Sequence, residues 1–207
     1  MRIIVNILAQ IFSLVFYPLF IPTYGVALFC YTLHSPLLWA AIAITGTLLL
    51  TCVIPLTSIW IMIRNGKVQD IQIANADERT MPYLYSTIGF AFWSYLMTAV
   101  LHGPQFLTYV CIGATVALAI ITIVNRWWKI SAHLTGIGGL FGGVMNYYIA
   151  IGSAPSWVII VVLLLLSLCV MYARLRANAH TSTQVVAGWL LGIGCTCFPY
   201  SLVHYVA

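Results

Sequence analysis

Apolar residues follow one another along this chain in long stretches, and short polar segments separate the stretches. A helix needs about 20 apolar residues to cross the hydrocarbon core of a membrane. About seven stretches approach or exceed that length: 4–33, 37–63, 83–101, 106–124, 132–151, 156–173 and 184–204. The pattern predicts an all-α integral membrane protein, a helical bundle of about six to seven transmembrane helices. Because the first stretch contains Pro18 and Pro22, we expect it to kink or break there.

The composition supports this class and a single domain. Hydrophobic residues make up 63% of the chain and charged residues 5%, whereas a soluble domain carries about a quarter charged residues. No polar stretch is long enough to fold separately, so residues 1–207 form one expected membrane-embedded domain. The six cysteines all lie in apolar stretches without the spacing of zinc ligands, and we interpret them as packing residues.

Charged residues occupy only alternate connections between the apolar stretches. With the spans numbered in order, every Lys, Arg, Asp and Glu falls on the side of the N-terminus. The basic residues are Arg2, Arg64, Lys67, Arg79, Arg126, Lys129, Arg174 and Arg176. Positive residues favour the cytoplasmic side, so we expect this face to be cytoplasmic, in a multi-pass protein of a bacterial cytoplasmic membrane. The net charge of +5 therefore reflects topology, and no nucleic-acid partner is expected.

Three polar clusters interrupt the chain on this face, each just before an apolar stretch. They cover residues 75–82, 129–133 and 173–188. Together they contain two histidines, His133 and His180, with several arginines, a lysine and a serine. Guanidinium groups and a hydroxyl are suited to bind phosphate oxygens, and one histidine can attack phosphorus while the other protonates the leaving oxygen.

Each component has a simpler interpretation when taken alone. A histidine at a membrane boundary is more often an interfacial residue than a catalyst, and arginines in such loops are first of all topology signals. Polar clusters of this kind recur three times on one face of the protein, and this recurrence favours a binding or catalytic site.

The third cluster resembles the signature of the type 2 phosphatidic acid phosphatase superfamily. In that signature an Arg is followed by five residues, a His, three residues and an Asp; here the corresponding residues are Arg174, His180 and Gln184. Residues 130–133, Ile-Ser-Ala-His, resemble the family's Pro-Ser-Gly-His. Arg79 stands where the family's first motif has its arginine, with Pro82 displaced by two positions. The resemblance covers about residues 64–192.

The resemblance implies a role for each of these residues. His180 would be the nucleophile that forms a phosphohistidine, and His133 the general acid for the leaving group. The phosphate oxygens would be held by Arg79, Arg174 and Ser131, with a backbone amide near Ala132, and Lys129 and Arg176 add positive charge. The family's mechanism needs no metal or other cofactor, and its substrates are mostly lipid phosphates and diphosphates.

Two departures from the family pattern affect the expected chemistry. Gln184 replaces the aspartate that orients the nucleophile; its amide oxygen can accept from the imidazole N–H, but it cannot stabilise the imidazolium charge. Gln72 stands where the first motif has a lysine, and Lys67 and Lys129 are candidates to replace that lysine.

Glycines follow the second and third clusters at spacings that allow close helix packing. Gly138 with Gly142, and Gly139 with Gly143, have the GxxxG spacing, and Gly188 and Gly192 follow His180. We expect these glycines to bring the two histidine-bearing helix starts together.

The leading hypothesis is a metal-independent lipid phosphatase whose partners are a phosphorylated lipid substrate and the membrane lipids. One alternative keeps the fold but lacks efficient hydrolysis, and binds a phosphate lipid or transfers its phosphoryl group. A small transporter is the other alternative, although its ionisable groups should lie within the spans and here they lie at the boundaries. The lipid and the oligomeric state stay open.

Overall fold

A computed structural model of the chain describes residues 10–69, 73 and 77–205, with side chains for all of these except 77 and 198–205. This part of the chain folds into helices and turns without a strand, so the predicted all-α class is confirmed. The helices are α2 (Ile21–Thr32), α3 (Leu37–Leu48), α4 (Ile54–Arg64), α5 (Thr80–Ala99), α6 (Gln105–Val124), α7 (Ala132–Ala150), α8 (Trp157–Arg176) and α9 (Ser182–Tyr205). A π-helical segment, η1 (Leu49–Val53), joins α3 to α4, and a short 3-10 turn, η2 (Asp77–Arg79), precedes α5.

The first apolar stretch breaks where its prolines predict. Residues 10–15 are helical, the chain then turns through residues 16–20, and Pro22 lies in the first turn of α2. There the missing N–H of proline costs no helical hydrogen bond. With 12 residues, α2 is about 18 Å long, shorter than the hydrocarbon core of a membrane.

Within the described part of the chain, three helical segments are long and apolar enough to cross a membrane. They are the continuous segment Leu37–Arg64, which combines α3, η1 and α4, and the helices Gln105–Val124 and Trp157–Arg176. These segments indicate a membrane protein. The larger number of six to seven spans stays a prediction.

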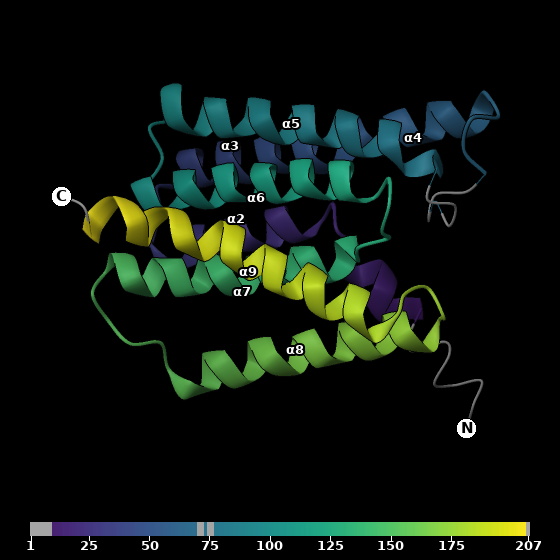
Figure 1. Ribbon diagram of the computed structural model, residues 1–207. Coiled ribbons are helices and arrows are strands. Elements are labelled where there is room, and N and C mark those ends of the chain that lie inside the picture. Colours follow the sequence, from purple (N-terminus) through teal and green to yellow (C-terminus); the bar gives the residue numbers. More distant parts are fainter. Residues whose placement is uncertain (1–9, 70–72, 74–76, 206–207) are drawn as a thin grey trace.

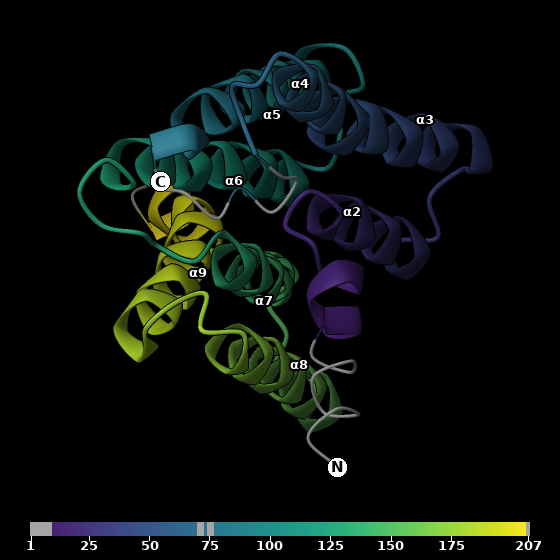
Figure 2. The same cartoon turned by 90° about the vertical axis from the view of Figure 1, so that its right-hand side faces the viewer.

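Helix α7 lies at the centre of the bundle. It contacts α2, α6, α8 and α9. The view along the helices places α8 on one side of it, and on the other side α4 and α5 beyond α6 and α3 beyond α2 (Figure 2). The connections from α4 to α5, α6 to α7 and α8 to α9 all lie at one end of the bundle, on the right in Figure 1. We call this the charged end, because every described Lys and Arg lies on these connections or in the helix turns beside them.

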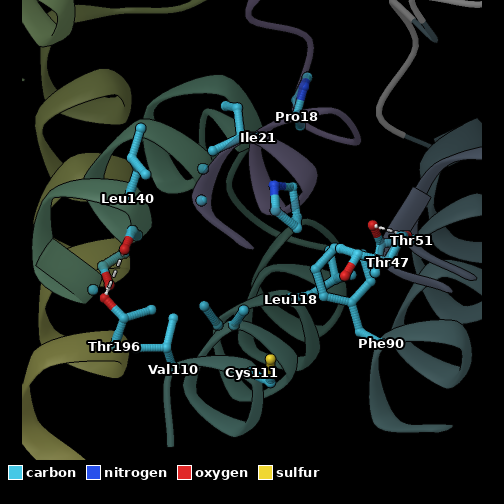
Figure 3. A pocket seen from close by; sticks show the side chains of 18 of the residues that line it. Pro18, Ile21, Thr47, Thr51, Phe90, Val110, Cys111, Leu118, Leu140 and Thr196 are labelled. Atoms are coloured by element: carbon cyan, nitrogen blue, oxygen red, sulfur yellow. Dashed lines mark hydrogen bonds between the residues drawn. The ribbon is translucent and has the colours of Figure 1, made fainter. Parts of the chain in front are cut away.

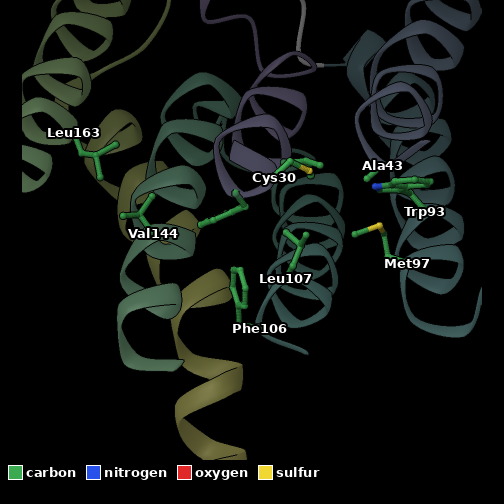
Figure 4. Packing of buried hydrophobic residues seen from close by; sticks show 10 residues of the cluster. Cys30, Ala43, Trp93, Met97, Phe106, Leu107, Val144 and Leu163 are labelled. Atoms are coloured by element: carbon green, nitrogen blue, oxygen red, sulfur yellow. The ribbon is translucent and has the colours of Figure 1, made fainter. Parts of the chain in front are cut away.

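A cluster of buried hydrophobic side chains fills the other half of the bundle. Trp93 and Met97 of α5 face Ala43 of α3, while Phe106 and Leu107 of α6 lie toward α2 and α7 (Figure 4). This packing holds the helices in place behind the charged end.

Glycines allow α7 and α9 to pack backbone against backbone, as their spacing predicts. A Cβ atom at Gly138 would meet the carbonyl of Trp189, and one at Gly192 would meet the carbonyl of Thr135. A Cβ atom at Gly188 would lie 2.6 Å from the carbonyl oxygen of Ser131. The start of α7 is therefore in direct contact with the first three turns of α9.

This contact predicts opposite effects for two glycine substitutions in α9. We expect Gly192→Ala to lower the free energy of unfolding by about 1–3 kcal/mol, because the added methyl overpacks the interface. Gly194→Ala is the matched control, since no described atom lies within 4 Å of the position that its methyl group would take; it should leave stability unchanged or raise it by up to about 1 kcal/mol. Thermal unfolding in nanodiscs measures both, and equal midpoints for the two variants would contradict this account of the interface.

Candidate active site

A polar cavity at the charged end brings residues of all three sequence clusters together. Its lining includes Arg79 from the start of α5, His133 from the start of α7, Arg174 from the end of α8 and His180 from the α8–α9 turn. The cavity volume is about 70 Å³, several times the roughly 15 Å³ that one water needs. Four of the predicted site residues, up to 101 positions apart in sequence, thus face one space.

The start of α5 holds Arg79 in a fixed position. Its Nε donates to the carbonyl of Ile73 at 2.7 Å, its guanidinium also donates to the hydroxyl of Tyr83, and only 5% of its surface is exposed. Arg79 is therefore a buried, anchored cation in the wall of the cavity.

Arg174 and His180 are brought to the same cavity by a Schellman turn at the end of α8. The N–H of Ala179 donates to the carbonyl of Arg174 at 3.2 Å, and the N–H of Asn178 donates to the carbonyl of Leu175 at 3.0 Å. These are the two hydrogen bonds of that motif. Asn178 has a φ of 50°, a left-handed conformation that asparagine tolerates better than most residues.

Arg174 is a buried cation with an unused donor. It is 8% exposed, and its Nε, which is inaccessible to solvent, has no hydrogen-bond partner among the described residues. Neither Asp nor Glu is among the described side chains that line the cavity. Two buried guanidiniums facing a cavity without a carboxylate favour the binding of an anion, because an uncompensated buried charge is unfavourable.

The hydrogen bond of His180 determines which ring nitrogen is free. Its Nδ1 lies 3.2 Å from the carbonyl oxygen of Lys129, and a carbonyl can only accept. Nδ1 therefore carries the proton and Nε2 keeps its lone pair. Burial, followed by the positive charges of Arg174 and Arg79, lowers the pKa of His180 to about 4, so Nε2 is an available nucleophile at neutral pH.

His133 is held by the segment before α2. Its Nε2 donates to the carbonyl of Ser13 at 3.1 Å, and its ring meets the ring of Tyr17 edge to face, with 5.6 Å between the centroids. The hydrogen bond spans 120 positions in sequence. The polar cavity is therefore closed on one side by the segment that the break at Pro18 creates.

Gln184 has a different partner from the one that the family pattern predicts. Its amide oxygen accepts from the backbone N–H of Thr181 at 3.0 Å, while its own backbone N–H donates to the hydroxyl of Thr181 at 3.4 Å. This is the reciprocal capping box of a helix start, written in the sequence as Thr-Ser-Thr-Gln. The orienting contact to His180 comes from the Lys129 carbonyl instead.

Three further predicted phosphate ligands do not line the polar cavity. Ser131 is fully buried, and its hydroxyl caps α7 by accepting from the N–H of Leu134 at 3.5 Å. Arg176 is exposed two positions beyond Arg174. Lys129 contributes its carbonyl, and its ammonium stays within electrostatic reach, since burial and then Arg79 and Arg174 lower its pKa. Of these three residues, Lys129 has a contact to a lining residue, the hydrogen bond from His180 to its carbonyl.

The cavity also contains polar side chains that none of the three sequence clusters predicts as site residues. Tyr83 and Ser86 lie on α5 and Tyr17 precedes α2. Tyr83 and Ser86 follow Arg79 by four and seven positions, so helical spacing places all three on one face. Sequence contains no comparable signal for Tyr17, because only tertiary contacts bring it to the cavity.

Several charged or polar residues on the predicted charged face lie outside the part of the chain that the structure describes: Arg2, Asp70, Gln72 and Asn75. Among the residues that are described, no three His, Cys, Asp or Glu side chains gather as a metal site would require.

The capping box predicts a structural effect for a substitution of Gln184. Gln184→Ala should lower the free energy of unfolding by about 1 kcal/mol, the usual effect of losing a cap, and should change the rate of phosphate release by less than about threefold. Ser182→Ala, an exposed neighbour, is the matched control and should change neither. If Gln184→Ala instead lost activity by several orders of magnitude at unchanged stability, Gln184 would be the residue that orients His180.

The lowered pKa of His180 predicts that its imidazole stays neutral, and reactive toward acylating reagents, in mild acid. Carbethoxylation by diethyl pyrocarbonate requires neutral imidazole, so its rate at His180, followed by peptide mass spectrometry, should fall to half near pH 4 and not near the ordinary value of about 6.5. Between about pH 6.5 and about pH 4 the imidazole of His180 is protonated in the unfolded chain and neutral in the folded one. The contribution of His180 to the free energy of unfolding therefore falls as the pH drops through this range. A midpoint near 6.5 would contradict the buried, positively charged setting.

The chain matches no protein-family model, and neither a curated protein nor a solved structure is significantly similar to it.

Proposed function

We propose that this chain is a membrane-embedded phosphatase that hydrolyses a lipid phosphate monoester or diphosphate through a phosphohistidine, without a metal. The observation that carries the proposal is the polar cavity, in which two buried arginines and two histidines meet and no described carboxylate lines the wall. Guanidinium groups match the oxygens of phosphate in geometry and in charge.

In the first step, Nε2 of His180 attacks phosphorus, and the bond from phosphorus to the ester oxygen breaks. The substrate binds as the monoanion, whose proton passes to Nδ1 of His133, the ring nitrogen that the Ser13 carbonyl leaves free. His133 then gives this proton to the leaving oxygen, so the lipid departs as an alcohol. In the second step, water attacks phosphorus, and the bond from phosphorus to Nε2 of His180 breaks. Nδ1 of His133 takes a proton from that water, and inorganic phosphate is released. Arg79 and Arg174 stabilise the negative charge on the equatorial oxygens in both steps.

The position of the cavity favours a lipid substrate. It lies at the charged end of a bundle that contains three helical segments able to cross a membrane. We place this end at the cytoplasmic surface of a multi-pass bundle of six to seven spans, in line with the positive-inside rule. A headgroup at that surface would reach the cavity without leaving the membrane.

The resemblance to the type 2 phosphatidic acid phosphatase superfamily supports the same assignment of roles. The carbonyl of Lys129 provides the tautomer control that an aspartate provides in that family, at 3.2 Å from Nδ1. A carbonyl has no full negative charge, so it stabilises an imidazolium less than a carboxylate does. This difference favours one second candidate, a protein of the same fold that binds a phosphate lipid with slow turnover.

Phosphate release from a purified preparation separates the two candidates. The protein in nanodiscs is incubated with phosphatidate, a prenyl phosphate and a prenyl diphosphate, with and without EDTA. The phosphatase proposal expects continuous release of phosphate that EDTA does not reduce. Thermal stabilisation by orthovanadate without any release would support the binding protein, and neither release nor stabilisation would overturn both.

A further inference from the structure

A second, larger cavity lies inside the bundle. Its volume is about 120 Å³, it is partly open to the outside, and its wall is formed by α2, α3, η1, α5, α6, α7 and α9. Figure 3 shows Ile21, Leu118, Phe90 and Val110 around it. We call it the apolar cavity.

The few hydroxyls in its wall are already satisfied. Thr47 donates to the carbonyl of Ala43 at 2.6 Å, Thr51 donates to the carbonyl of Thr47 at 2.8 Å, and Thr196 donates to the carbonyl of Gly139 at 3.0 Å. A cavity needs two to four polar partners to hold a water, and apolar cavities of this size stay dry and bind hydrocarbons. The apolar cavity is therefore suited to an apolar occupant.

The apolar cavity and the polar cavity are neighbours with a common wall. Four residues line both of them: Pro18, Leu19, Leu118 and Ala132. Ala132 directly precedes His133, so the apolar cavity begins beside the side chains that face the phosphate position. Small residues widen it farther along, with Gly25, Ala114 and Gly139 in its wall.

We propose that the apolar cavity holds a hydrocarbon chain of the same molecule whose phosphate binds in the polar cavity. The ligand class is then a lipid phosphate with a chain that enters the protein beside His133 and runs between α2, α6 and α7, instead of staying in the bilayer. This inference rests on the proposed function for the position of the phosphate. It adds a second determinant of specificity, the length of the chain.

Chain length should change affinity until the apolar cavity is filled. Each buried methylene contributes enough free energy for up to about fourfold in affinity. Binding of butyl, octyl and dodecyl phosphate to the His180→Ala protein in nanodiscs measures this effect without turnover. Affinity should rise by well over tenfold from butyl to octyl phosphate.

Filling the cavity should remove this dependence. In Ala114→Leu the larger side chain occupies part of the apolar cavity, so octyl and dodecyl phosphate should lose at least about tenfold in affinity while butyl phosphate loses less than about twofold. Val116→Leu is the matched control on the same helix, because Val116 is 45% exposed and does not line the cavity. It should bind all three probes like the His180→Ala parent.

Photolabelling tests the position of the chain in a protein with no cavity substitution. Dodecyl phosphate with a terminal diazirine should label residues of α6 that line the apolar cavity away from the shared wall, such as Val110 and Cys111. Labelling confined to the exposed Ile112 and Val116 would overturn the proposal, because the chain would then lie in the bilayer. So would equal loss of butyl and dodecyl phosphate binding in Ala114→Leu.

The two proposals fail in different ways. Length-dependent binding and cavity labelling without any phosphate release would retain the hydrocarbon site and overturn the phosphatase. Phosphate release with no dependence on chain length would retain the phosphatase and overturn the hydrocarbon site.

Discussion

His180→Ala should reduce phosphate release from a lipid phosphate by at least about 10⁴-fold. The substitution removes the Nε2 lone pair that the Lys129 carbonyl leaves free, and loss of a nucleophile removes a step that the other groups cannot replace. Initial rates of phosphate release in nanodiscs measure the effect. A radiolabelled substrate should also leave acid-labile phosphate on the wild-type protein and none on the variant.

His102→Asn is the matched control for this substitution. His102 is an exposed histidine in the connection from α5 to α6, which lies at the end of the bundle opposite the charged end (Figure 1). Its φ of 46° is one that asparagine tolerates. The control should keep wild-type activity and stability. Activity of His180→Ala within tenfold of the wild type would remove His180 from the nucleophile position.

Arg174→Met should produce effects of opposite sign on activity and on stability. The buried guanidinium has an Nε without a partner among the described residues and shares its cavity with Arg79. An apolar side chain of similar length should therefore raise the free energy of unfolding of the unliganded protein by about 1–2 kcal/mol. Phosphate release should fall by about 10²–10³-fold, because a donor to the transition state is lost.

Thermal unfolding with and without orthovanadate tests both effects. Orthovanadate should stabilise the wild-type protein and should not stabilise Arg174→Met. Arg176→Met is the matched control, since Arg176 is exposed on the same helix and does not line the polar cavity; it should retain activity and the response to orthovanadate. A destabilised Arg174→Met that still responds to orthovanadate would show that the guanidinium serves the fold and not the anion.

Local patterns in the sequence predict several structural features around the cavity correctly. The sequence spacing of Arg174 and His180 corresponds to closeness in space. A Schellman turn with Asn178 in the left-handed conformation reverses the chain after α8, so His180 comes back beside Arg174. The glycines at 138 and 192 predict the contact between α7 and α9, because backbones can approach only where side chains are absent. Both features depend on residues close together in sequence or on a helical period.

At Gln184 the structure shows a different contact from the one that the family pattern suggests. At that position a family pattern and a local capping pattern compete for one side chain. The capping contact forms because its donor, the N–H of Thr181, is only three residues away. It lies at a helix start, where backbone donors need partners other than helical carbonyls. The Thr-x-x-Gln spacing already contained this signal.

By itself the sequence determined the all-α class, the break at Pro18 and Pro22, the charged end, and the residue types that a phosphate would need. Only the tertiary structure decided which of these side chains share a cavity, that Ser131 and Arg176 do not line it, and that a backbone carbonyl orients His180. The physical reason is that apolar length and charge act locally along the chain. A polar cavity depends instead on how segments far apart in sequence pack together. In helices this apolar, no periodic pattern indicates which faces meet.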